Sequence, residues 1–101
     1  MNIDILFTDQ DRHVRFLLGL YIKRKRNERG MSISELASRV YVTQESLKRI
    51  ESGKKNLSPG DLAKFQDQLN FEYGDLIEIH KIAKVAYVND ISKVMVPDYP
   101  A

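Results

Sequence analysis

The segment 44–52 holds the side chains of this chain that are best suited to specific hydrogen bonding. At a helical repeat of about 3.6 residues, Leu47 and Ile50 fall on one side of the segment. The opposite side holds polar residues: Gln44, Glu45, Lys48, Arg49 and Ser52. Amide, carboxylate and cationic groups on one helix face have the donors and acceptors that pair with base edges in the major groove of DNA. This polar face is the strongest indication of chemistry in the sequence.

No comparable grouping indicates catalysis or a cofactor. The sequence has no Cys, so a thiolate metal site, a thiol nucleophile and a disulfide framework are excluded. His13 and His80 lie far apart in the sequence and have no ligand-like neighbours. No Ser/His/Asp grouping, carboxylate pair or glycine-rich phosphate loop stands out. We therefore expect neither an enzyme nor a metal or other cofactor.

Charge is distributed unevenly along the 101 residues, although the formal net charge is only +2. Residues 12–55 contain 12 Lys or Arg and 4 acidic residues, a net charge of +8. Residues 1–11 and 56–101 each carry a net charge of −3. A basic centre between acidic ends is typical of a domain that presents one surface to phosphates. A solvated, charged helix face is the alternative interpretation.

Composition indicates one globular domain. A chain with 43% hydrophobic and 30% charged residues can bury a core of modest size. Residues 1–11 lack the basic start and the longer apolar run of a signal peptide. No run of residues approaches the length that would span a bilayer. We therefore expect a cytoplasmic protein, from a prokaryote or a phage-infected cell, with no membrane association.

Start and stop signals predict four helices and the beginning of a fifth. Ser32 and Glu35 form a capping-box pattern, in which Ser32 caps the second helix and Glu35 reaches back to it. Gly30 and Gly53 follow the first and third helices as stops. The expected helices are 11–29 with Asp9 or Asp11 as cap, 33–40 after Ser32, 44–52 after Thr43, 59–70 after Ser58 with Pro59 at its first position, and one from about Gly74.

The sequence leaves the structure of residues 85–96 open. Two apolar stretches flank Asn89 and Asp90, which could form a hairpin turn. The alternative, which we favour, is that the fifth helix runs to Tyr87 with Asn89 as its stop. An extended tail with Pro97 and Pro100 would then follow.

Residues 18–69 resemble the phage-repressor type of helix-turn-helix, the Xre/Cro-like family. The matching stretches are LGLYIKRKRNERGMS, ELA at 35–37, VTQESLKRIESG at 42–53 and the capped helix that begins SPGDL. The most specific part is the combination of ELA, the Thr43 cap and the Ile50-Glu51-Ser52-Gly53 ending. The resemblance covers about half of the chain. It implies an all-α, five-helix repressor-like domain with a short C-terminal extension.

The resemblance also implies roles for individual residues. Gln44 looks like the family's glutamine that contacts an adenine edge, and its amide offers the donor and acceptor for bidentate pairing. Arg49 or Lys48 would contact guanine, and Glu45 would accept from the amino group of cytosine. The candidate phosphate contacts are Thr43, Ser52, Lys54, Lys55 and Asn56. For the loop residues 54–56, plain solvation is the alternative.

Other residues are implied to be structural. Ala37 is the small residue where the two helices of the motif touch, and Leu47 and Ile50 anchor the reading helix on the core. Glu51 matches the family's structural glutamate, whose partner in the first helix would be Arg26. Such a half-buried ion pair would fix the geometry between the two helices.

Two positions depart from the family pattern. Tyr41 replaces the glycine usual in the turn, where a left-handed backbone costs a bulky residue about 1 kcal/mol or more. Either the turn is rebuilt, or Tyr41 gains compensating packing. Ile33 replaces a glutamine that touches a phosphate, and an exposed Ile there would favour contact with a partner surface.

Together these features predict a sequence-specific, repressor-like transcriptional regulator that binds operator DNA as a homodimer. Residues 1–10 would form an N-terminal extension and residues 11–71 the DNA-binding domain. Residues 72–101 would supply the fifth helix, a C-terminal extension and the surface for dimerisation or a partner. The alternative is an antitoxin-type module of the same fold that acts mainly through a protein partner, such as a toxin or another regulator. A controller of a restriction-modification operon is a variant of the first hypothesis.

Overall fold

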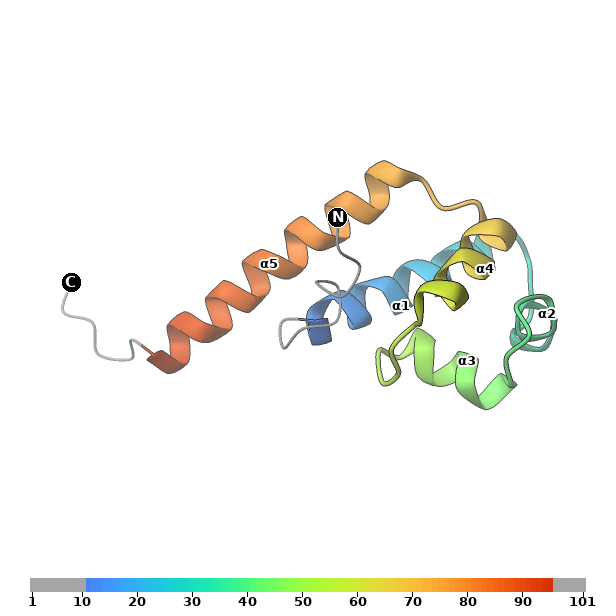
Figure 1. Ribbon diagram of the computed structural model, residues 1–101, viewed down its shortest axis with the longest axis horizontal. Helices are drawn as coiled ribbons and strands as arrows, with labels where there is room; N and C mark the ends of the chain where they lie inside the picture. The colour runs from blue at the N-terminus through green and yellow to red at the C-terminus, as the bar shows by residue number, and fades with distance from the viewer. Residues whose placement is uncertain (1–10, 96–101) are drawn as a thin grey trace.

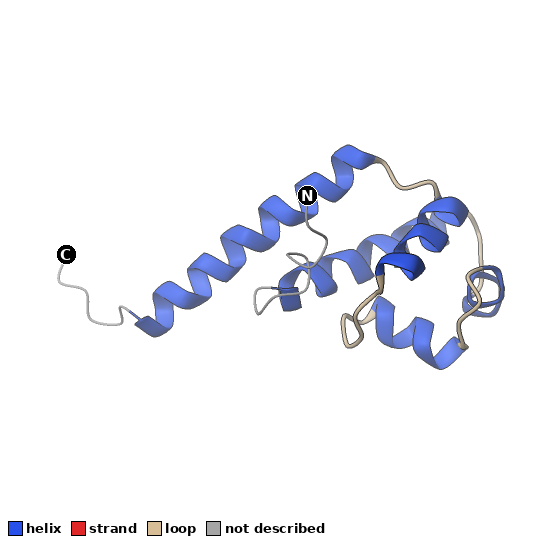
Figure 2. Cartoon of the chain, in the orientation of Figure 1, coloured by secondary structure: helices blue, strands red, loops and turns tan. Residues whose placement is uncertain are grey.

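The computed structural model describes the backbone of residues 11–95 and the side chains of residues 12–86. The described chain is all-α and contains no strand (Figure 2). Its five helices are α1 (Asp11–Glu28), α2 (Ile33–Arg39), α3 (Gln44–Glu51), α4 (Pro59–Leu69) and α5 (Tyr73–Met95). The first helix packs against α3, α4 and α5, while α2 packs against α3 (Figure 1). The predicted fold class is therefore confirmed.

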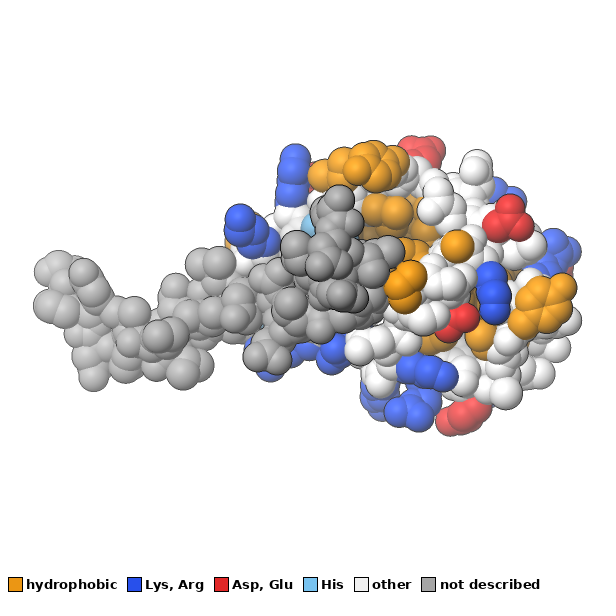
Figure 3. All heavy atoms as spheres, in the orientation of Figure 1, with side chains coloured by type: hydrophobic (Ala, Val, Ile, Leu, Met, Phe, Trp, Pro, Cys, Tyr) orange, Lys and Arg blue, Asp and Glu red, His pale blue; other side chains and the backbone are white. Residues whose placement is uncertain are grey.

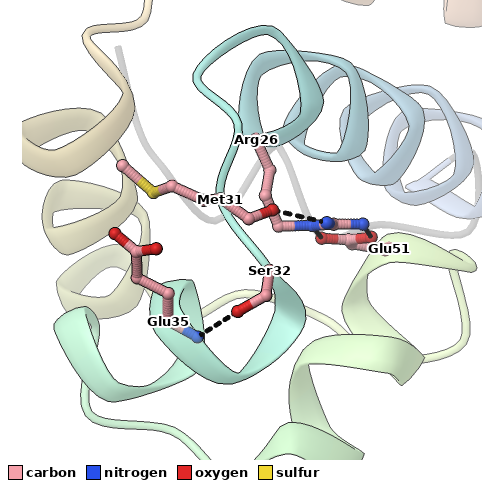
Figure 4. A network of polar contacts seen from close by, with 5 residues as sticks. All are labelled: Arg26, Met31, Ser32, Glu35 and Glu51. Atoms are coloured by element: carbon pink, nitrogen blue, oxygen red, sulfur yellow. Dashed lines mark hydrogen bonds and ion pairs between the residues drawn. The ribbon is translucent and has the colours of Figure 1, made fainter.

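Three side-chain caps fix where the short helices begin. The hydroxyls of Ser32, Thr43 and Ser58 accept hydrogen bonds from backbone N–H groups three residues later, at donor–acceptor distances of 3.0, 3.0 and 3.1 Å. Each bond satisfies one of the amide donors that a helix start leaves without a partner. The prediction that the Glu35 side chain reaches back to Ser32 is wrong. The Glu35 carboxylate accepts from Arg39 one helical turn later, and it points away from Ser32 (Figure 4).

Apolar side chains from the first four helices meet in one core. Ala37 is 2% exposed where α2 and α3 meet, and Ile50 is 3% exposed. Full burial of a large apolar side chain contributes roughly 1.5–3 kcal/mol. Ile33 packs against this core, so the expectation of an exposed partner-binding Ile is wrong. The largest fully buried side chains are Ile22, Leu36, Val40, Leu47, Phe65 and Leu69.

The backbones of α1 and α3 approach each other closely at Gly19. A Cβ atom added to Gly19 would lie 2.4 Å from the carbonyl oxygen of Ile50 and 2.7 Å from that of Glu51. Both neighbours are backbone atoms, so a rotamer change could not relieve the clash. Gly19 therefore sets how closely the third helix can dock on the first.

The fifth helix is longer than the sequence predicted. It continues through Asn89 and Asp90 to Met95, so the hairpin alternative and the expected stop at Asn89 are both wrong. The helix starts beside the bundle, and its C-terminal part extends away from the other four helices (Figure 1). Among the described residues, no helix combines the length and apolar character that a membrane span requires. The possible Asp9 cap, the N-terminal extension and the tail with Pro97 and Pro100 lie outside the described residues.

Candidate nucleic-acid interface

The third helix has one buried face and one exposed face. Leu47 and Ile50 are buried in the core, which fixes the rotation of α3 about its axis. The four residues predicted to contact bases, Gln44, Glu45, Lys48 and Arg49, are all exposed. Lys and Arg side chains gather around the end of α3 and the loop that follows it (Figure 3). The helix therefore presents hydrogen-bonding groups from a rigidly held support.

The predicted phosphate contacts occupy the two ends of α3 and the loop after it. Thr43 is exposed, but its hydroxyl already accepts from the Ser46 N–H as the helix cap. The Ser52 hydroxyl donates to the carbonyl oxygen of Arg49 at 3.1 Å. The Lys55 ammonium donates to the Ser46 hydroxyl at 3.0 Å.

The rest of this loop lies at the surface. Lys54 and Asn56 are exposed. The backbone N–H of Lys54 donates to the carbonyl oxygen of Arg49 at 2.9 Å, which closes the end of the helix. Gly53 adopts a left-handed backbone with φ 74°, and an added Cβ would lie 2.8 Å from the Cα of Phe16. The loop is therefore held against the first helix.

Arg26 and Glu51 form a bidentate ion pair between α1 and α3 (Figure 4). The Arg26 Nε and Nη2 atoms donate to the two Glu51 carboxylate oxygens at 2.7 and 3.0 Å, and Nη1 donates to the Met31 carbonyl oxygen at 2.9 Å. The two residues are only 8% and 7% exposed. The hydrogen bond that Arg26 donates to Glu51 raises the pKa of Arg26, against the opposing effect of burial. The pair is thus part of the scaffold that orients α3, since its charged groups are occupied.

Sequence reasoning missed Arg15, Gly19 and the contact between Tyr21 and Asp75. Arg15 reaches from α1 to the loop after α3, and its partners lie about forty positions away in the sequence. The Tyr21 hydroxyl donates to the Asp75 carboxylate at 2.7 Å and so links α1 to α5. No pattern of neighbouring residues in the sequence indicates these contacts, because each depends on how the helices pack.

The turn between α2 and α3 keeps the left-handed backbone that the family pattern implies. Tyr41 has φ 59°, so the turn is not rebuilt to suit the bulky residue. Its side chain is 83% exposed, and the Lys64 ammonium lies 5.9 Å from the ring centroid. The contact with Lys64 at the surface is therefore one source of compensation for the backbone strain.

Comparison with known proteins agrees with this geometry. The family model described as helix-turn-helix matches residues 22–76, more than half of the chain. The chain belongs to the Xre/Cro-like helix-turn-helix family. The helix-turn-helix itself consists of α2, the turn at Tyr41 and α3.

A solved structure is similar over most of the chain. The crystal structure of the clp gene regulator ClgR from Corynebacterium glutamicum aligns with a TM-score of 0.63 and 27% sequence identity. The alignment covers 87% of this chain and 96% of that one. The likeness therefore extends beyond the helix-turn-helix segment. None of the curated proteins compared with the chain matches it.

Proposed function

We propose that this helix-turn-helix protein is a sequence-specific, DNA-binding regulator of transcription, which lays α3 in the major groove. The observation that carries the proposal is the division of α3 into a face locked in the core and an exposed face with four hydrogen-bonding side chains. Membership of the helix-turn-helix family and similarity to a structure described as a gene regulator support the same function. The protein would act in the cytoplasm by competing with polymerase for an operator.

Each exposed side chain of α3 suits a different base edge. The Gln44 amide can pair with adenine through one donor and one acceptor. The cations of Lys48 and Arg49 suit the two acceptors of guanine, and the Glu45 carboxylate suits the amino group of cytosine. Gln44 and Glu45 belong to the first turn of α3. Recognition helices contact base edges through their N-terminal residues, which supports these assignments.

The experiment starts with a binding selection from random duplexes, followed by fluorescence anisotropy on the recovered sequence. Replacing both Gln44 and Arg49 with Ala should weaken binding at least tenfold, since one lost pairing with a base costs about 1–3 kcal/mol. The matched control replaces Gln66, an exposed amide on α4, and Lys23, an exposed ammonium on α1, and should bind as the wild type does. Failure to recover any sequence, or equal binding by the α3 variant, would contradict the proposal.

We also propose that the regulator binds as a homodimer through α5. Ile77, Ile82 and Val85 are exposed apolar residues on this helix, outside the face that packs on α1. A helix that extends from a small domain with apolar residues exposed favours burial against another chain. One reading helix covers few base pairs, so two half-sites about one helical turn apart would multiply the specificity. A different partner, such as a toxin, could use the same residues, and a monomeric protein in solution would favour that alternative.

A further inference from the structure

The side chain of Arg15 links the loop between α3 and α4 to the first helix. Arg15 is half-buried on α1, and its Nε donates to the Gly53 carbonyl oxygen at 3.5 Å. Its Nη1 donates to the Oδ1 of Asn56 at 3.2 Å. The close approach of Gly53 to the Phe16 backbone and the burial of Leu57, 4% exposed, fix the loop on the same helix. Arg15 therefore spans the loop from its second residue to its fifth.

The chemistry of the two side chains determines how the Asn56 amide is oriented. A guanidinium has five N–H donors and no acceptor, so only the amide oxygen of Asn56 can face it. The amide nitrogen of Asn56, with its two N–H donors, then lies on the side away from Arg15. Asn56 is exposed, so these donors are accessible to a ligand. A phosphate oxygen is an acceptor and would match them.

We propose that Arg15 is a positioning residue, which fixes the Asn56 amide so that its nitrogen donates to a phosphate of the DNA backbone. The inference rests on the proposed function and adds a residue outside the helix-turn-helix. On the other side of Asn56, the contact of Lys55 with the Ser46 hydroxyl holds the preceding residue against α3. A loop held from both sides loses little conformational entropy when it meets the backbone of DNA, so its phosphate contacts come at lower cost.

Asn56→Asp tests the orientation directly. Aspartate keeps an oxygen that accepts from Arg15, but it replaces the outward donors with a negatively charged acceptor. On the duplex recovered by selection, the affinity should fall at least tenfold while the thermal unfolding temperature stays near the wild-type value. Wild-type affinity in Asn56→Asp would overturn the proposal and leave the proposed function standing.

A double-mutant cycle separates positioning from direct contact. If Arg15 acts through Asn56, then Arg15→Ala and Asn56→Ala weaken binding by a similar factor, about tenfold, and the double variant is no weaker than either. Arg15→Ala should also leave the slope of log affinity against log salt unchanged, because Arg15 itself neutralises no phosphate. Additive losses, or a slope reduced by about one, would overturn the proposal in favour of a direct Arg15–phosphate contact.

Two controls distinguish failure of the positioning proposal from failure of the proposed function. Lys23→Ala removes an exposed cation from the same helix and should preserve both affinity and salt slope. Loss of binding in the Gln44→Ala and Arg49→Ala variant, measured on the same duplex, reports the proposed function independently. If that variant loses affinity while every Asn56 variant binds normally, only the positioning role is wrong.

Discussion

At the scale of single residues, the orientation of α3 depends on contacts made by residues that do not lie on its exposed face. Glu51 belongs to α3, yet its carboxylate is occupied by Arg26. Removing one partner of such a buried pair leaves an uncompensated charge, which costs more than the pair contributes as a whole. The scaffold and the candidate reading residues thus alternate along eight residues of one helix. A substitution on α3 must be assigned to one role or the other before its effect on DNA binding is interpreted.

Tyr41 is a residue whose backbone strain should be removable. Tyr41→Gly should raise the free energy of unfolding by about 0.5–1 kcal/mol, because glycine adopts φ near +60° without the Cβ clash. The loss of the Lys64 contact and the greater freedom of glycine in the unfolded chain offset part of the gain. Urea unfolding measures the change. Tyr41→Ala is the control and should give no such gain, since alanine keeps a Cβ; equal stabilisation by alanine would contradict the explanation.

At the scale of elements, helix starts were predictable and helix docking was not. Each cap, at Ser32, Thr43 and Ser58, joins atoms of residues three positions apart. The types of nearby residues in the sequence therefore predict it. The contacts of Arg15 and Gly19 join segments more than thirty positions apart and follow from packing alone. The end of α5 was mispredicted because Asn89 and Asp90 favour turns only weakly against the helix around them. The exposure of the predicted reading residues followed from helical periodicity.

Gly19 should tolerate no side chain, because the backbone of α3 occupies the space. Gly19→Ala should lower the free energy of unfolding by about 1–3 kcal/mol through overpacking, even though alanine is the better helix former. Gly60→Ala is the matched control, since nothing lies within 4 Å of its added Cβ. Gly60→Ala should be neutral or slightly stabilising in the same urea titration. A Gly19 variant as stable as the wild type would show that α3 can shift outward at no cost.

The docking of α5 on α1 should weaken at high pH. Burial, followed by the hydrogen bond to Asp75, raises the pKa of Tyr21 from 10.0 to about 12. Because the pKa is raised in the folded state, the neutral Tyr21 hydroxyl stabilises the fold. This stabilisation is complete below pH 10 and is lost as the pH rises towards 12. The loss would amount to about 2–3 kcal/mol. Unfolding free energies between pH 9 and pH 12 should fall more steeply for the wild type than for Tyr21→Phe, which cannot ionise; parallel curves would contradict the assignment.

At the scale of the whole molecule, the bundle and the extended α5 have separate tasks in the proposed regulator. The bundle fixes α3, while α5 carries apolar residues beyond what the bundle covers. Leu76, Ile79 and Ala83 pack inward, so substitutions at Ile82 and Val85 should leave the fold intact. This separation makes dimerisation and base reading independently testable.

Replacing Ile82 and Val85 with Glu should convert the proposed homodimer into a folded monomer. Two carboxylates on the apolar face would have to be desolvated in the dimer, which costs several kcal/mol. Sedimentation equilibrium reports the mass, and Gln66→Glu, an exposed change on α4, should keep the wild-type mass. On a duplex with one half-site the double variant should bind as the wild type does. On a duplex with two half-sites it should bind at least tenfold more weakly, because only the dimer gains from the second site. An unchanged mass would place the interface elsewhere, and equal affinity for both duplexes in the wild type would contradict the dimer itself.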